Sequence, residues 1–398
     1  MLLAEAVGRS GLAAARSLSR RGVSFVAVGH EPKGMVAASR HVGRYVEAPS
    51  AEDDPQAFLD VVIEICAKGD VRLVIPVLDA TLAVCSEDRE CLPEGTTLAV
   101  PDAEAVRNVL DKRLNLETAR RLDVRCPAEF ALESFDQIPE LIDRIGFPMV
   151  LKNPGWGSDG SRPASAFKWQ IAKDERGLRT LLVEHSAGGR FPVCQELVEG
   201  IVTNLCCFVV DGEIVAAQQY RSLRRLAWAG VAVLREIVAS DPRLVEQAGR
   251  LLAELQWDGV AHVAFVVRPS DGATWYMETN GRFWGSIETS IATGWDFPYW
   301  QYRYFAHGDV PAPPPPAIGR RSCWHFGDLQ LLQRRLRGIE PPVPPGPGTR
   351  RAIADYLSGF APGVRSDVFR LDDPLPDLVE HWEWIRGGVA KRLRQRTA

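Results

Sequence analysis

Apolar residues in the first hundred positions alternate between helical and strand-like spacing. The spacing predicts amphipathic helices that end at Gly22 and Gly69, each followed by a short apolar strand. The four segments are GLAAARSLSRRG (11–22), VSFVAVG (23–29), AFLDVVIEICAKG (57–69) and VRLVIPVLDA (71–80). Only Gly8 and Gly11 of VGRSGLAAA match a dinucleotide-binding glycine loop, so a plain strand-to-helix turn is the preferred interpretation. Alternating helices and buried strands indicate a parallel, doubly wound α/β domain over residues 1–103.

The pattern changes to helices with antiparallel strands over residues 104–310. Apolar runs joined by turns at 210–213 and 269–272 predict hairpins, and hence an α+β domain. Ten of the 28 prolines then fall between positions 311 and 347. We therefore expect a Pro-rich linker and a small, separate C-terminal region over residues 311–398.

Composition excludes several classes of function. The 398 residues carry a net charge of -4 with 25% charged positions, so a basic nucleic-acid-binding surface is not expected. No apolar run reaches membrane-spanning length, and the opening MLLAE lacks the features of a signal peptide. The eight cysteines are scattered without a CxxC pair, so neither zinc nor disulfides are indicated. A cytoplasmic protein without nucleic-acid or membrane partners is expected.

A polar motif follows the apolar run ATWYM. In METNGRFWGSIE, Glu278, Asn280 and Arg282 occupy alternate positions, so a continuing strand would point all three toward the same side. A solvated outer strand face has this pattern too. The alternative is a functional site, because carboxylate and amide oxygens suit Mg²⁺ and a guanidinium binds phosphate or carboxylate oxygens.

Lysine is rare in this chain. Arginine outnumbers it 40 to 7, so each lysine calls for a reason. Lys152 ends the predicted strand PMVLK and precedes a loop that contains Gly157, Ser158 and Gly160. Backbone N–H groups of such a loop can approach phosphates closely, although glycine and serine also form ordinary turns.

Five segments in order resemble the ATP-grasp superfamily, in its carbamoyl-phosphate-synthetase-like branch of carboxylate-amine ligases. They are LDKRLNLETARRLDV, GFPMVLKNPGWGSDGS, VCQELVEG, WDGVAHVAFVV and METNGRFWGS. The resemblance covers residues 1 to about 310. It implies an N-terminal pre-ATP-grasp domain and an ATP-grasp domain with lobes 104–190 and 191–310. It also implies ATP and Mg²⁺ as ligands, with two metal ions expected and Mn²⁺ as an alternative.

The resemblance assigns roles to the matching nucleotide-binding residues. Lys112 and Lys152 would contact the phosphates, and the loop with Gly157, Ser158 and Gly160 would close over them. The backbone of Glu196 and Val198 would hold the adenine edge, and Met277 would pack near the ring. A buried strand is the alternative interpretation of VCQELVEG.

The same resemblance makes Glu278 and Asn280 metal ligands and Arg282 a clamp on the transferring phosphoryl group. Arg235, with Arg221, would face the anionic acceptor, and a surface or interdomain salt bridge is the equal alternative. The chain departs from the family at Ala264, where an acidic or amide metal ligand is usual. It also departs at Gly281, where proline is common.

The implied activity is amide or peptide bond formation from a small-molecule carboxylate and an amine through an acyl phosphate, with release of ADP. Two alternatives remain open. One is an ATP-binding scaffold or regulator with weakened catalysis, which Ala264 favours, and the other is a bicarbonate-activating carboxylase. Asp79, at the end of VIPVLD, either pairs with an amine or caps a helix. A homodimer is also left open.

Overall fold

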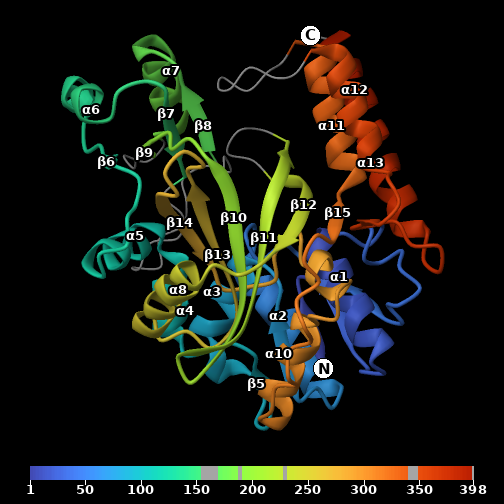
Figure 1. The fold of residues 1–398 in the computed structure, drawn as a ribbon. Helices are drawn as coiled ribbons and strands as arrows, with labels where there is room; N and C mark the ends of the chain where they lie inside the picture. The colour runs from blue at the N-terminus through green and yellow to red at the C-terminus, as the bar shows by residue number, and fades with distance from the viewer. Residues whose placement is uncertain (154–168, 187–190, 227–230, 339–347, 397–398) are drawn as a thin grey trace.

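The computed structural model describes residues 1–153, 169–186, 191–226, 231–338 and 348–396, with the side chains of 387–396 excepted. Three sheets and the helices around them form the molecule (Figure 1). The predicted mixed α/β and α+β architecture is confirmed.

A five-stranded parallel sheet forms the N-terminal domain, in the order β3-β2-β1-β4-β5. Its strands are β1 Leu2–Ala4, β2 Val26–Gly29, β3 Tyr45–Glu47, β4 Leu73–Pro76 and β5 Thr97–Leu98. Its helices are α1 Gly8–Arg20, α2 Pro55–Lys68 and α3 Asp79–Glu87. Leu2 and Val74 pack with residues of α2, whereas Leu3 and Leu73 pack with residues of α1. Both faces of the sheet are therefore buried, which explains why its strands read as continuous apolar runs.

Local sequence fixes the helix boundaries in this domain. The Asp54 side chain accepts a hydrogen bond from the N–H of Ala57 at 3.1 Å, and Pro55 follows as the first residue of α2. Capping by an acid followed by proline is a favoured helix start. The helix ends at Lys68, one residue before the predicted stop at Gly69.

A four-stranded antiparallel sheet in the order β6-β9-β7-β8 forms the first lobe of the second domain. Its strands are β6 Glu129–Ala131, β7 Met149–Lys152, β8 Trp169–Ala172 and β9 Val193–Glu196. The helices of this part are α4 Ala103–Leu110, α5 Lys112–Arg121, α6 Ile138–Ile145 and α7 Glu175–His185. Apolar side chains of α6 and α7 bury one face of the sheet around Leu151 and Cys194.

The third sheet has seven strands in the order β14-β13-β10-β11-β12-β15-β16. They are β10 Ile201–Val210, β11 Glu213–Arg225, β12 Ala232–Val238, β13 Gly259–Val267, β14 Thr274–Asn280, β15 Arg321–Cys323 and β16 Val364–Ser366. The helices α8 Pro242–Glu254, α9 Glu288–Ile291 and α10 Phe297–His307 accompany them. Asp211 and Gly212 join β10 to β11 with φ of 52° and 77°, which is the hairpin turn that the sequence predicts.

The C-terminal region is built onto this third sheet. Its short strands β15 and β16 extend the sheet beyond β12, so the region expected to be separate shares the sheet of the second domain. Helices α11 His325–Leu336, α12 Thr349–Ser358 and α13 Leu375–Arg396 stand side by side at one end of the molecule (Figure 1).

Buried ion pairs tie the loop before α13 to the rest of the chain. Arg16 of α1 donates from Nε to Asp373 Oδ2 at 2.8 Å, and Arg235 of β12 donates from Nη1 to Asp367 at 2.8 Å. Arg370 is paired with Glu288 of α9. Because these groups are removed from water, each charge depends on its partner.

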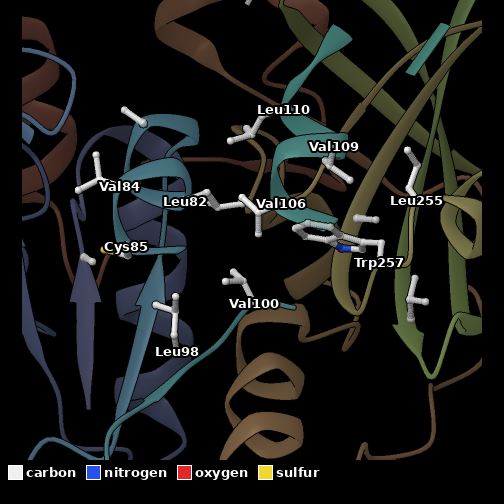
Figure 2. Packing of buried hydrophobic residues seen from close by; sticks show 14 of the residues in the cluster. Leu82, Val84, Cys85, Leu98, Val100, Val106, Val109, Leu110, Leu255 and Trp257 are labelled. Carbon is white, nitrogen blue, oxygen red and sulfur yellow. The ribbon is translucent and has the colours of Figure 1, made fainter. Parts of the chain in front are cut away.

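An apolar core joins the two domains around Trp257. Figure 2 shows Val106 and Val109 of α4 directed toward the indole, with Leu82 of α3 beyond them. The Trp257 Nε1–H donates to the carbonyl of Val260 at 2.9 Å. The indole is therefore buried with its polar atom satisfied.

Within the described residues, no helix has the length and apolar character required to cross a bilayer.

Two adjacent aspartates allow a test of the buried pairs. Asp373→Asn should lower the free energy of unfolding by about 3–5 kcal/mol, because it leaves the Arg16 charge buried without an anionic partner. Asp372→Asn is the matched control, since the Asp372 carboxylate is 55% exposed beside Arg20 and should cost about 1 kcal/mol or less. Chemical denaturation followed by tryptophan fluorescence measures both, and equal effects would contradict the assignment.

Candidate functional site

The polar motif lies where β14 ends beside β13. Ala264 pairs with Glu278 and His262 with Asn280, and a bulge beyond Ala264 places Met277 as the extra residue of β14. The Asn280 amide donates to Glu278 Oε1 at 3.3 Å, and Arg282 Nη2 reaches Asn280 Oδ1 at 3.5 Å. Arg282 lies beyond the strand end, yet the three side chains are together as their alternation predicts.

Two lysines from other elements surround Glu278. Burial acts to raise its pKa, but the ammonium groups of Lys112 and Lys152, together with the Asn280 hydrogen bond, outweigh burial and hold the pKa at about 2. Burial lowers the pKa of Lys152, and Glu278 opposes that shift. A carboxylate with a lowered pKa thus lies near cations from α5 and β7, and the fold brings together three residues that are distant in sequence.

Two polar residues that the sequence did not reveal dock α5 onto β14. The Tyr276 hydroxyl donates to Asn115 Oδ1 at 3.0 Å, and the Asn115 amide donates to the carbonyl of Asp111 at 2.8 Å. The Asp111 side chain caps α5 by accepting from the N–H groups of Arg113 and Leu114. This network fixes the start of α5, where Lys112 lies. The sequence indicates this network only through Asn115 and Tyr276, which are polar residues with apolar neighbours in the chain.

Arg282 also contacts the N-terminal domain. Its Nε and Nη2 donate to the two carboxylate oxygens of Asp79 at 2.9 and 3.0 Å, and Nη1 donates to the carbonyl of Phe283 at 3.1 Å. Asp79 is the first residue of α3, and the N-cap is Leu78, with no side-chain cap hydrogen bond. The expected alternative of a helix cap is therefore not what the structure shows, because the Asp79 carboxylate pairs with Arg282 instead.

His262 is a buried neutral residue. Burial lowers its pKa to about 3. Its ring stacks on Trp284 at 5.1 Å between centroids, and Nε2 is 2.8 Å from the Tyr220 hydroxyl. These contacts agree with a structural role for His262 rather than with a metal ligand.

Arg235 and Arg221 are both committed to ion pairs. Arg235 is fully buried against Asp367 and also donates to Ser322 Oγ at 3.0 Å, whereas Arg221 donates to Glu236 at 2.6 Å. Among the described residues, no ion pair or hydrogen bond joins Arg235 to the Glu278 motif. The expected contact of Arg235 with an acceptor is therefore replaced by the interdomain salt bridge, because Asp367 already compensates its charge.

The expected adenine-binding segment lies at the end of β9. Val198 and Met277 pack in one apolar cluster with Trp275. The N–H of Glu196 donates to the carbonyl of Ala128 at 2.8 Å, which leaves only the carbonyl of Glu196 for a base. Gly157, Ser158 and Gly160 lie outside the described residues.

The oxygen donors at the end of β14 suit a hard cation that takes its remaining ligands from water or from a bound substrate. Over the described ranges, no cluster of three or more His, Cys, Asp or Glu side chains could hold a metal by itself. Glu278 and Asn280 offer two oxygen donors, and Ala264, directly opposite Glu278, offers none. Mg²⁺ suits such a site because it usually retains waters and phosphate oxygens.

The three sheets have the arrangement of the ATP-grasp fold. No protein-family model matches the chain. The chain is 23% identical over 316 residues to the carbamoyl phosphate synthase large chain of Rubrobacter xylanophilus, covering 72% of this chain and 27% of that protein. It thus spans about a quarter of the length of this curated relative. This similarity confirms the predicted resemblance to the carbamoyl-phosphate-synthetase-like branch.

Solved structures share the fold. One is the ADP complex of purK, N5-carboxyaminoimidazole ribonucleotide synthetase, with a TM-score of 0.61, 15% identity and 85% coverage of both chains. Another is an L-amino acid ligase from Bacillus licheniformis, with a TM-score of 0.60, 12% identity and coverage of 77% of this chain and 73% of that one.

A lysine of the site and a lysine on the surface should differ in their effect on ATP binding. Lys152→Met should weaken ATP binding by roughly 10- to 100-fold, because a half-buried ammonium in the proposed contact with phosphate oxygens has no neutral substitute. Lys173→Met, at an exposed position directly after β8, should leave binding unchanged. Calorimetry measures both affinities, and equal binding by the two variants would remove Lys152 from the nucleotide site.

Proposed function

We propose that this chain is an ATP-dependent, ADP-forming ligase that joins a small-molecule carboxylate to an amine through an acyl phosphate. The observation that carries the proposal is the ionised Glu278 among Lys112 and Lys152, beside Asn280 and Arg282. Phosphoryl transfer needs aligned atoms and compensated charge more than covalent participation by the protein. This cluster supplies both.

Each residue has a separate task in the proposal. Lys112 and Lys152 bind the ATP phosphates, helped by the backbone of the loop that holds Gly157, Ser158 and Gly160. The carbonyl of Glu196, the backbone of Val198 and the Met277 side chain hold the adenine. Glu278 and Asn280 hold two Mg²⁺ ions, for which Mn²⁺ substitutes, and the ions neutralise phosphate charge when bound. Arg282 orients the phosphoryl group that is transferred.

The reaction balances in two steps. A carboxylate oxygen attacks the γ-phosphorus of ATP, the bond to the bridging oxygen breaks, and ADP leaves. The amine nitrogen then attacks the acyl carbon, and the C–O bond to phosphate breaks as the C–N bond forms. Of the two protons that the ammonium loses, one goes to phosphate and one to solvent. Activation is required because a carboxylate is a poor electrophile.

A substrate screen tests the proposal. The twenty L-amino acids are supplied in pairs as carboxylate and amine, and ADP release is followed with each amine present or absent. Amine-dependent ADP release with a ligated product supports the ligase. ATP binding without turnover would instead indicate a scaffold, and incorporation of labelled bicarbonate would indicate a carboxylase.

Glu278→Gln should reduce ADP formation by on the order of 1,000-fold or more, because the amide can neither balance the lysines nor hold a metal as a carboxylate does. Glu254→Gln removes an exposed ion pair with Arg121 and is the matched control. Circular dichroism checks folding. Activity close to wild type in a folded Glu278→Gln variant would reject Glu278 as a metal ligand.

Ala264→Glu should lower the Mg²⁺ concentration for half-maximal ADP formation by on the order of tenfold, since it adds a hard anionic oxygen opposite Glu278. Ala264→Gln is the control, because it has almost the same size without the charge. A magnesium titration of both variants and the wild type separates charge from crowding. An unchanged requirement in a folded Ala264→Glu protein would mean that Ala264 does not face the metal.

A further inference from the structure

The Arg282–Asp79 pair crosses from the ATP-grasp domain to the N-terminal domain. Arg282 Nε and Nη2 lie 2.9 and 3.0 Å from the Asp79 carboxylate oxygens, and the side chains of Arg282 and Asp79 are 22% and 41% exposed. The same Nη2 reaches Asn280 at 3.5 Å. Arg282 thus lies between an acid of one domain and the metal-binding motif of the other. An anion beside Asn280 would compete with Asp79 for this guanidinium.

Asp79 lies where open α/β sheets bind ligands. The strand order β3-β2-β1-β4-β5 reverses direction between β1 and β4, and Asp79 follows the carboxyl end of β4. The crevice outside the carboxyl ends of two such strands is the usual ligand site of doubly wound sheets.

Glu5, a second acid near the carboxyl ends of these strands, already has hydrogen-bond partners within the protein. Glu5 follows β1 and is buried, where it accepts hydrogen bonds from Thr81 Oγ1 at 2.5 Å and from the N–H of Ala51 at 3.2 Å. His30 lies 3.1 Å from the same carboxylate. Asp79 is more exposed, and its one ion-pair partner among the described residues is Arg282. Asp79 lies in the first turn of α3, where the helix dipole stabilises a negative charge, so its carboxylate stays ionised when Arg282 moves away.

We propose that Asp79 binds the ammonium group of the acceptor amine, and that it becomes free to do so when Arg282 turns to the acyl phosphate. This inference rests on the proposed ligase function. When the anionic acyl phosphate forms, Arg282 leaves Asp79 to bind it. Asp79 can then bind the ammonium group, so the amine is bound tightly only after the carboxylate is activated. Asp79 positions the amine and takes no part in phosphoryl transfer.

Two nucleophiles separate amine binding from activation. Hydroxylamine is uncharged near neutral pH, attacks an acyl phosphate to give a hydroxamate, and needs no carboxylate to hold it. The L-amino acids present an ammonium group. Hydroxamate formation and amide formation are therefore measured in parallel, with the same L-amino acids as the carboxylate substrates.

Asp79→Asn should raise the KM for the amino-acid amine by roughly 10- to 100-fold, the range for a lost charged hydrogen bond. It should change hydroxamate formation and the KM for ATP by less than about threefold, because Asp79 itself contacts neither ATP nor the carboxylate substrate in this proposal. Asp79→Glu should restore part of the affinity for the amine. Glu87→Gln is the matched control, because it removes a bidentate pair with Arg107 from the other end of α3, where the side chains are 44% and 36% exposed.

Each outcome decides a different point. A selective loss of amine affinity with intact hydroxamate formation supports Asp79 as the amine site. An equal loss of both reactions, or an unchanged KM for the amine, overturns it and leaves a structural salt bridge. Wild-type protein that forms neither ADP nor hydroxamate with any carboxylate overturns the ligase function, and the Asp79 assignment with it.

Discussion

The ionised carboxylate of Glu278 is the constraint on which the arrangement of this site depends. A carboxylate removed from water is costly unless opposite charge lies close by, and here Lys112 and Lys152 provide it. The three residues come from α5, β7 and β14. The first lobe, the helix that leads into it and the third sheet must therefore converge on one point. The two lysines also repel one another, so the proposed binding of a polyanion such as triphosphate would relieve that repulsion.

A second set of buried charges holds the domains around that point. Asp367 and Asp373 compensate Arg235 and Arg16, which belong to different domains. Because the loop that carries both aspartates follows β16, the C-terminal region fastens α1 to the third sheet. The sequence of this region looks like a separate appendage after a proline-rich linker, but its buried aspartates join the N-terminal domain to the third sheet.

Local signals predicted much of the fold and part of the site. The helices that end near Gly22 and Gly69, the hairpin at 210–213 and the alternation of Glu278, Asn280 and Arg282 depend on neighbours in sequence. The rarity of lysine also singled out Lys152. The partner of Arg235 lies 132 residues away, and the pairing of Asp79 with Arg282 spans 203 residues. Such contacts follow from tertiary packing, which no local period encodes.

Packing between the domains also accounts for Gly281, the position where the resemblance to the ATP-grasp superfamily leads us to expect proline. A Cβ atom at this position would lie 2.4 Å from the indole of Trp257, a distance that would force the ring to move. The ring has no free space, since it packs with Val106 and Val109 of α4 and its N–H is bound to Val260 (Figure 2). Glycine thus lets the turn between Asn280 and Arg282 rest directly on the interdomain core. The backbone that carries Asn280 and Arg282 is consequently set by hydrophobic packing, which is insensitive to the charges that would change during the proposed phosphoryl transfer.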